Sequence, residues 1–186
     1  KKIYFFFLDM MQTILLAASI FLVIYIFLYR PFQVSGESMY PTFKDKEYIL
    51  TDLISLKFKS LEHGDVIVFR SPTDHEKDFI KRIVGLENDV VSLKDGSVYV
   101  NNIKLDEQKY LSNEVRTYGG GFLKEGQPVI VPKGKYLVMG DNRPYSSDSR
   151  EWGMLTQKEI IGKSFFVYWP LTVTRLIENP FQNKKK

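Results

Sequence analysis

The pattern of hydrophobic residues divides the chain into two unlike parts. Between Met10 and Tyr29 no residue is charged, and the strongly polar positions are Gln12, Thr13 and Ser19. As an α-helix this segment would be about 30 Å long, which matches the hydrocarbon core of a bilayer. It is therefore predicted to be a transmembrane helix, which Arg30-Pro31 ends sharply because proline cannot continue a helix.

A cleaved signal peptide is the alternative interpretation of this segment. Signal peptides have the same basic start and apolar middle, but the apolar run is shorter and stops at a cleavage site of small residues. The run here is long and is followed by a poor cleavage site, which favours an uncleaved anchor. Lys1 and Lys2 precede it and Arg30, Lys44 and Lys46 follow it, so the positive-inside bias leaves the topology open.

After Pro31 the hydrophobic pattern changes to the alternation that is typical of β-strands. The expected strands are 48–50, 65–70, 79–86, 89–93, 97–100, 128–131, 135–139 and 164–169. Asp95-Gly96 is expected to form a two-residue hairpin turn, because these residue types accept positive φ angles. Asn101-Asn102 indicates a second tight turn. The fold class is therefore expected to be mostly β, with one N-terminal transmembrane helix before the β domain.

Two segments of the β domain depart from the strand pattern. Residues 107–126 have no strong period and are expected to form an extended excursion from the core. Residues 156–161 are at most a short helix, with Thr156 as its cap and Glu159 at the capping-box spacing. The expected domains are a short N-terminal segment (1–9), the anchor (10–30), the β-rich domain (31–180) and a basic tail (181–186).

Composition and charge narrow the functional classes. The formal net charge is +4, and Lys184, Lys185 and Lys186 supply most of it, so the body is nearly neutral and has no basic stripe for nucleic acid. The hydrophobic fraction of 44% is typical of a folded domain. Without cysteine the chain has no disulfide, thiolate nucleophile or cysteine metal site, and its two histidines nearly exclude a histidine metal site.

The first candidate for chemistry is the serine of residues 35–42, Ser-Gly-Glu-Ser-Met-Tyr-Pro-Thr. Ser38 lies in a turn that Gly36 permits and Pro41 stiffens, with its backbone N–H expected to be free. By itself this segment is explained better as a plain turn after a membrane helix. The usual base for such a serine would be His63 or His75, but both are in polar turns and are interpreted as solvated loop residues, so a Ser-His-Asp arrangement is disfavoured.

The second candidate is a basic pair inside an apolar strand. Lys81 and Arg82 should point to opposite faces, one toward solvent and the other toward apolar surroundings. Burial among apolar groups can lower the pKa of a lysine from about 10.4 by several units, so its free amine could deprotonate a serine near neutral pH. The alternative is an edge-strand pair that prevents aggregation.

The third candidate is residues 138–153, a polar loop that ends at Trp152-Gly153. A solvated loop of this composition would be ordinary, but the apolar strand before it and the Trp-Gly end indicate a packed turn. Ion pairs between Asp141 and Arg143, and between Asp148 and Arg150, are expected to hold the loop rigid. The Ser146 hydroxyl is a candidate for holding a lysine amine in register.

In this order, these segments resemble the type I signal peptidase family, the membrane-anchored serine/lysine proteases that remove signal peptides. The resemblance covers nearly the whole chain and is carried by the anchor and by residues 30–34, 35–42, 64–69, 80–85 and 140–153. It implies a catalytic domain of coiled antiparallel β-sheets on the outer face of the cell membrane. It also implies secretory precursors with signal peptides as substrates, contact with membrane lipid, and no metal or cofactor.

The resemblance also assigns roles to individual positions. It makes Ser38 the nucleophile, Lys81 the general base and Ser146 the hydroxyl that orients the lysine. The other positions that match the family are the ion pair of Asp148 and Arg150, the turn of Asp141, Asn142 and Arg143, and the shallow substrate pockets of Phe32, Val34, Met39 and Ile80. The substrate is expected to bind as an extended strand along a sheet edge, with small side chains in these pockets.

Two positions depart from the family pattern. Some members have a serine two residues before the nucleophile that donates its hydroxyl to the oxyanion hole, whereas this chain has Gly36 there, so the second donor is open. Residues 86–89 stand where the family commonly has a Pro-Gly pair before an aspartate, which affects a turn only.

Two rival functions remain on the sequence alone. A self-cleaving repressor uses a related serine/lysine site, but it would need a DNA-binding module where this chain has its apolar segment. A membrane-anchored binding or structural domain without catalysis is the second rival. Replacing Ser38 with alanine separates it, because a binding role should survive the loss of one hydroxyl.

Overall fold

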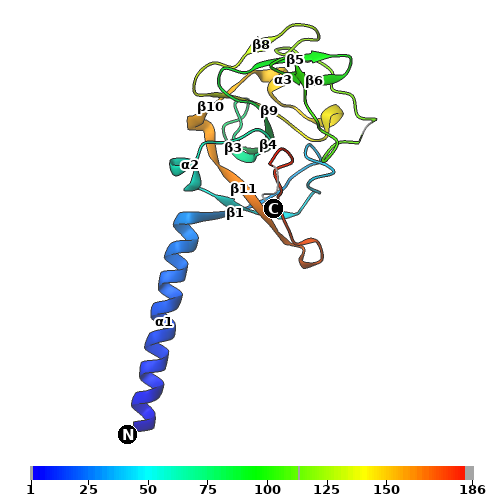
Figure 1. Ribbon diagram of the computed structural model, residues 1–186. Helices are drawn as coiled ribbons and strands as arrows, with labels where there is room; N and C mark the ends of the chain where they lie inside the picture. Colours follow the sequence, from blue (N-terminus) through cyan, green and yellow to red (C-terminus); the bar gives the residue numbers. More distant parts are fainter. Residues whose placement is uncertain (1, 113, 183–186) are drawn as a thin grey trace.

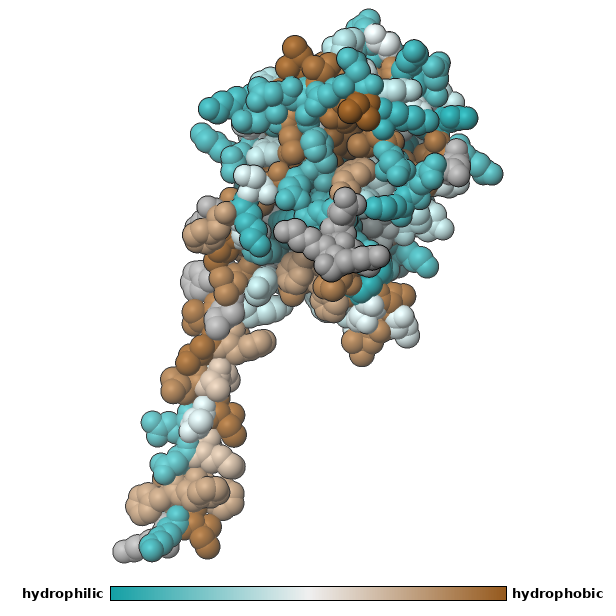
Figure 2. Space-filling model, viewed as in Figure 1, coloured by the Kyte–Doolittle hydropathy of each residue, from teal (hydrophilic) through white to brown (hydrophobic). Residues whose placement is uncertain are grey.

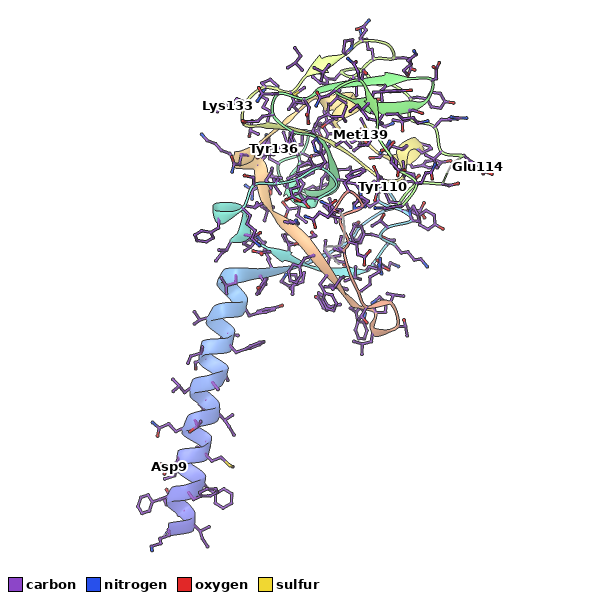
Figure 3. The ribbon with its side chains drawn as sticks, viewed as in Figure 1. Asp9, Tyr110, Glu114, Lys133, Tyr136 and Met139 are labelled. Atoms are coloured by element: carbon purple, nitrogen blue, oxygen red, sulfur yellow. The ribbon has the colours of Figure 1, made fainter. Side chains whose placement is uncertain are left out.

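A long helix stands apart from a β-rich body in the computed structural model, which describes residues 2–112 and 114–182 (Figure 1). The helix, α1 (Lys2–Leu28), exposes apolar side chains along its length (Figure 2), and its part from Lys2 to Val23 is long and apolar enough to cross a membrane. Figure 3 shows Asp9 projecting from the lower part of this helix.

The ends of α1 differ from the predicted ones. The helix begins at Lys2 rather than Met10, because the aromatic and apolar residues before Asp9 continue the same helix. It ends at Leu28, and strand β1 (Tyr29–Gln33) follows at once, so Arg30 and Pro31 lie in a strand rather than closing the helix. Proline is tolerated there because β1 is the edge strand of its sheet.

The body consists of two antiparallel sheets. The larger, eight-stranded sheet has the order β1-β2-β11-β3-β4-β9-β10, with β12 paired to β11, and the smaller one has the order β7-β6-β5-β8. The strands after β1 are β2 (Tyr48–Asp52), β3 (Val66–Arg70), β4 (Asp78–Gly85), β5 (Val90–Lys94), β6 (Ser97–Val100), β7 (Ile103–Lys104), β8 (Val129–Ile130), β9 (Lys135–Met139), β10 (Leu155–Thr156), β11 (Ile160–Trp169) and β12 (Arg175–Leu176). The smaller sheet lies at the end of the body remote from α1 (Figure 1).

Short helical turns connect these strands. They are α2 (Ser55–Phe58), η1 (Arg143–Tyr145), α3 (Ser149–Trp152), η2 (Gln157–Glu159) and η3 (Leu171–Val173). The predicted capping box is present in η2, where Thr156 and Glu159 exchange both bonds. The two predicted tight turns also form, with positive φ at Asp95, Gly96, Asn101 and Asn102.

The mostly β fold class is confirmed, and each of the eight expected strands has a counterpart. The sequence did not predict β1, β7, β10 or β12, and it placed the start of β11 at Ser164 instead of Ile160. β7, β10 and β12 are two residues long each, which is too short for alternation to be recognised.

The segment 107–126 differs from the excursion that was predicted. Its described residues, 107–112 and 114–126, form no regular strand, yet Tyr110, Leu111, Thr117 and Leu123 are all buried, so the segment packs across the body. Figure 3 shows Tyr110 inside the body and Glu114 at its outer edge. The hydrophobic pattern of this segment lacks a period because its backbone is irregular, and not because the segment lies away from the core. The predicted basic tail, residues 181–186, lies outside the described residues from 183 onward.

Three hydrophobic clusters fill the body, and one of them supports the serine turn. This cluster contains Val34, Met39 and Phe43 from the turn segment, packed against Ile49, Val66, Val68 and Val167 of the larger sheet. Two buried side chains therefore flank Ser38 on either side along the chain, Val34 before it and Met39 after it. The packing of apolar neighbours fixes where the serine turn sits.

Candidate active site

The turn that carries Ser38 is held at several points. Val34 N–H donates to the Glu47 carbonyl (2.8 Å), and Gly36 N–H donates to Asp45 Oδ1 (2.8 Å). Gly36 has a φ of +87°, a conformation that residues with a side chain rarely adopt, so glycine is needed here. The Ser38 carbonyl accepts from Asn142 N–H at 3.0 Å, which joins the turn to the polar loop.

Lys81 reaches this serine from strand β4. Its Nζ donates to Ser38 Oγ at 2.7 Å and to the Ile80 carbonyl at 3.0 Å, and the residue is only 4% exposed. Burial lowers the pKa of Lys81 from 10.5 to about 8, against the opposing charges of Asp148 and Asp141. A lysine with this pKa is partly neutral near pH 7 and can accept a proton.

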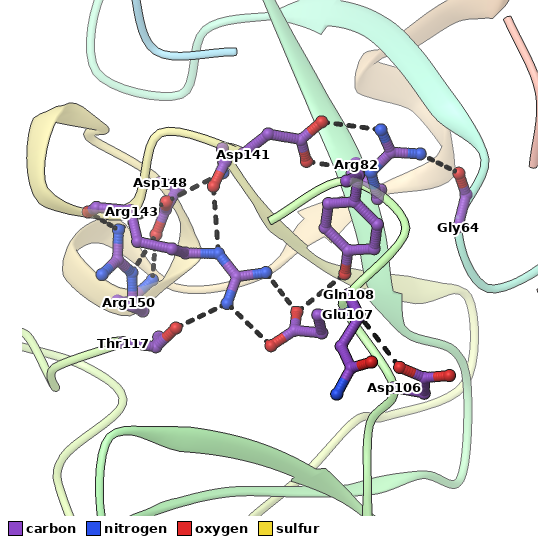
Figure 4. A network of polar contacts seen from close by, with 12 residues as sticks. Gly64, Arg82, Asp106, Glu107, Gln108, Thr117, Asp141, Arg143, Asp148 and Arg150 are labelled. Carbon is purple, nitrogen blue, oxygen red and sulfur yellow. Dashed lines mark hydrogen bonds and ion pairs between the residues drawn. The ribbon is translucent and has the colours of Figure 1, made fainter. Parts of the chain in front are cut away.

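Arg82, the next residue of β4, points to the opposite face, as alternation predicted. One of the two basic residues was expected to reach solvent, and this is wrong, because Arg82 is 2% exposed. Its guanidinium pairs with Asp141 at 2.6 Å and donates to the Gly64 carbonyl at 2.8 Å (Figure 4). Both faces of β4 are covered here, so an arginine can be buried if its charge is paired.

The ion pair expected between Asp141 and Arg143 does not form. Arg143 pairs instead with Glu107, from the segment without regular strands, and its Nη1 donates to Thr117 Oγ1 at 2.6 Å (Figure 4). Burial alone would lower the pKa of Arg143, but the charge of Glu107 raises it above the usual value. Asp141 is satisfied by Arg82 and by the Thr42 hydroxyl at 2.5 Å.

The pair of Asp148 and Arg150 forms as expected. Arg150 Nε and Nη2 both lie 2.8 Å from the carboxylate, which also accepts from Gly140 N–H at 3.0 Å. Burial would raise the pKa of Asp148, but Arg150 and the Gly140 N–H bring it below its ordinary value. A Cβ on Gly140 would lie 2.4 Å from the Ser38 carbonyl, so this position allows no side chain.

Ser146 lies beside the same glycine but not in contact with the lysine. A Cβ on Gly140 would lie 2.2 Å from Ser146 Oγ, which is buried and lies near enough to Asp148 to help lower the pKa of that carboxyl. The described partners of Lys81 Nζ are Ser38 Oγ and the Ile80 carbonyl. Nevertheless, the hydroxyl is close enough to the Ser38 turn to remain part of the site.

A cavity of about 220 Å³ opens beside Ser38 and Lys81. Phe32, Val34 and Ile80, which were predicted to line substrate pockets, are on its wall, together with Ser35, Ile49, Val68, Asp78, Phe79 and Ser147. Met39 is not on this wall, because it packs into the hydrophobic cluster beneath the turn and is 1% exposed.

Neither histidine is placed to act on Ser38. His63 Nε2 lies 2.6 Å from Asp89 Oδ2, and His75 is exposed in the turn before β4. Within residues 2–112 and 114–182, no group of His, Asp and Glu side chains is arranged to hold a metal ion. The bonding geometry around Ser38 thus leaves Lys81 as the group that can take its proton.

Comparison with known proteins is consistent with this geometry. The sequence profile of the family "Signal peptidase, peptidase S26" matches residues 7–169. The chain belongs to this family.

Relatives within the signal peptidase family match most of the chain. Signal peptidase IB of Staphylococcus aureus (strain MRSA252) is 35% identical over 95% of this chain and 98% of its own length. Signal peptidase I S of Bacillus subtilis (strain 168) is 36% identical over 90% of this chain and 92% of its own length. A crystal structure of a signal peptidase I from Enterococcus faecalis V583 covers 56% of this chain and 97% of its own, with 29% identity and a TM-score of 0.47.

Sequence reasoning missed three residues of this signal peptidase site. They are Arg82, Glu107 and Thr42, which neutralise or bond the charged groups of the polar loop. Arg82 was recognised only as the neighbour of Lys81, and Glu107 lies in a segment without a period. The one signal for Arg82 was its place in an apolar strand, where a buried cation requires a carboxylate partner.

The buried pair of Glu107 and Arg143 yields a stability prediction. Replacing Glu107 with alanine leaves the Arg143 charge buried without a carboxylate, which should lower the free energy of unfolding by about 3–5 kcal/mol. Denaturant titration of the full chain in detergent measures this. Glu114→Ala, at an exposed position of the same segment, is the control and should change it by less than about 0.5 kcal/mol. Equal losses in the two variants would contradict the assignment.

Proposed function

We propose that this chain is a membrane-anchored serine endopeptidase that removes N-terminal signal peptides from exported precursor proteins, with Ser38 as nucleophile and Lys81 as general base. The observation that carries the roles is the 2.7 Å contact between Ser38 Oγ and a buried lysine amine whose pKa is about 8. Membership of the signal peptidase family supplies the reaction and the class of substrate.

The mechanism follows from this pair of atoms. Neutral Lys81 takes the proton of Ser38 as Oγ attacks the carbonyl carbon of the scissile bond. Lys81 then gives this proton to the leaving amine, and a water molecule deprotonated by the same lysine hydrolyses the acyl-enzyme. Asp141, Asn142, Arg143, Asp148 and Arg150 act on neither atom directly and hold the loop that abuts the serine turn.

The developing oxyanion requires hydrogen-bond donors at the serine turn. The Ser38 N–H has no acceptor among the described residues and is available to an oxyanion. The Gly36 N–H is occupied by Asp45, and Gly36 has no side chain to donate, so neither group of this residue is the second donor. We assign Ser38 N–H as one donor of the hole.

The substrate lies as an extended strand between two open sheet edges. On one side, Val34 N–H donates to the Glu47 carbonyl and the Val34 carbonyl accepts from Lys46 N–H, in the segment that leads into β2. By alternation, the main-chain groups of Gln33 and Ser35 then point toward the cavity. On the other side, Ile83 bonds the main chain of Gly64 and Asp65, next to β3. By alternation, the main-chain groups of Asp78 and Ile80 point to the opposite, open side of β4. β9 pairs with β4 only from Arg82 onward, which leaves that edge free.

The anchor places the site at a membrane. α1 holds the protease domain (31–180) to the bilayer as a single-pass anchor, and we assign that domain to the outer face, where exported precursors emerge. The helix then contacts lipid along its exposed apolar surface. By similarity to the family, we assign Ser146 as the hydroxyl that orients Lys81.

Loss of either member of the pair should abolish cleavage. Ser38→Ala and Lys81→Met remove the nucleophile and the base with little change in volume, so kcat/KM should fall by about 10³-fold or more in each. The double variant should be hardly worse, because the two groups act as a unit. The measurement is cleavage of a secretory precursor by the full chain in detergent, with the new amino terminus identified by mass spectrometry. The control is His75→Ala, and wild-type cleavage by Ser38→Ala would support a binding role instead.

The pH dependence should report the lysine. Protonated Lys81 cannot accept a proton, so kcat/KM should fall about tenfold per pH unit well below pH 8 and level off above it. Lys81→Arg should be inactive at every pH tested, because a guanidinium stays protonated. The test is a pH series with wild type and variants. A midpoint that moves when His63 is replaced, but not when Lys81 is, would assign the base to histidine.

The cavity beside Ser38 should restrict the substrate to small side chains. Phe32, Val34 and Ile80 are packed, and a large residue would have to displace them at a cost of about 1–3 kcal/mol, or roughly a ten- to hundredfold loss of rate. We expect alanine to be favoured immediately before the scissile bond and two positions earlier. Peptides with alanine or tryptophan at these two positions measure this through kcat/KM. Equal cleavage of the two sets would remove the pocket assignment.

A further inference from the structure

An arginine near the end of the chain holds the turn that carries Ser38. Arg175 lies on β12, and its Nη2 donates to the Thr42 carbonyl and to Glu47 Oε2, both at 2.6 Å. Its Nη1 donates to Glu47 Oε1 at 3.1 Å, which makes the pair bidentate. No motif considered in the sequence includes Arg175, and the reaction does not use it.

Thr42 is the point where this arginine acts on the serine turn. Its hydroxyl donates to Asp141, the carboxylate that Arg82 neutralises, and its carbonyl accepts from Arg175. The residue is therefore held from two sides by separate charged groups. Between Ser38 and Thr42 the backbone turns tightly, with Tyr40 N–H bonded to the Glu37 carbonyl. A shift of Thr42 is transmitted to Ser38 through this short piece of chain.

Glu47 carries the second half of the hold. The residue is 3% exposed, and its Oε2 also accepts from Lys44 N–H at 3.2 Å. Its carbonyl accepts from Val34 N–H, which begins the segment that contains Ser38. Arg175 thus connects the segment 34–47 to β12, and β12 pairs with β11 in the larger sheet.

We propose that Arg175 is a positioning residue for Ser38. By holding Thr42 and Glu47, Arg175 keeps Ser38 Oγ at hydrogen-bonding distance from Lys81 Nζ. The inference rests on the proposed function, because it assigns a role within the same reaction. Misplacement of a reacting group by about 1 Å can cost roughly 100-fold in rate. Arg175 touches neither the substrate cavity nor Lys81, so its effect should appear in kcat.

A purely structural role predicts a different result. Arg175 is partly exposed and pairs with a buried carboxylate, so its loss should lower stability whether or not it positions the serine. Lys163 is a matched control, because its side chain is 33% exposed against 36% for Arg175, and it pairs with buried Asp65 at 2.7 Å. Among the described residues, Lys163 is paired with β2, β3 and Asp65 and not with the serine turn.

The experiment compares Arg175→Gln, Arg175→Lys and Lys163→Gln in the full chain in detergent. Precursor cleavage gives kcat, KM and the pH midpoint, and thermal unfolding gives Tm. We expect Arg175→Gln to lower kcat by about 10- to 100-fold, with KM within about threefold and the midpoint still near pH 8. Arg175→Lys keeps a positive charge beside Glu47, so its Tm should stay near wild type. A lysine cannot bond both Glu47 oxygens and the Thr42 carbonyl in one plane, so its kcat should fall.

The control defines what would overturn the proposal. Lys163→Gln should lower Tm with kcat within about twofold of wild type. If Arg175→Gln and Arg175→Lys also keep kcat within twofold while Tm falls, Arg175 is structural and the positioning role is wrong. A wild-type chain that cleaves no precursor would contradict the proposed function itself, and this inference with it. Cleavage by wild type with unchanged kcat in the variants contradicts the inference alone.

Discussion

The site depends on keeping the Lys81 amine out of water without surrounding it by free negative charge. Burial lowers the pKa of Lys81, but Asp148 and Asp141 lie close enough to raise it again. Each of these carboxylates is paired with an arginine, Asp148 with Arg150 and Asp141 with Arg82. Arg150 therefore acts on the lysine electrostatically as well as holding the loop, because its charge helps to lower the pKa of Lys81.

Burying these arginine–carboxylate pairs costs desolvation free energy, and their arrangement leaves few polar groups unpaired. Arg143 spans the Gly140 carbonyl, Thr117 and Glu107, which ties the polar loop to a segment without regular structure. Replacing buried ion pairs with apolar residues often leaves stability unchanged or increased. In this chain the arginines also set the geometry of the loop beside Ser38, because Arg143 bonds the Gly140 carbonyl and Arg150 bonds the Arg143 carbonyl.

Local features of the fold could be predicted from the sequence, whereas the long-range charge pairs could not. The hairpin at Asp95-Gly96 and the opposite directions of Lys81 and Arg82 depend on neighbouring residues, so turn chemistry and alternation were sufficient. The partner of Arg143 was assigned to its near neighbour Asp141, although the structure uses Glu107, which is distant in sequence. The tertiary packing of distant segments decides which carboxylate pairs with which arginine, and the local sequence pattern does not predict that packing. Strand β1 was missed because Pro31 ends helices and is also allowed on a sheet edge.

The junction between α1 and β1 has no linker. Leu28 ends the helix, Tyr29 begins the strand, and Leu53 N–H bonds to the Leu28 carbonyl at 3.1 Å, so the first sheet grows directly from the end of the anchor. A protease on a flexible tether would sample many heights above a membrane. Here the strand that begins at Tyr29 sets how far Ser38 lies from the end of α1. In the proposed function, Ser38 would then meet precursors at one height above the bilayer rather than over the range that a tether allows.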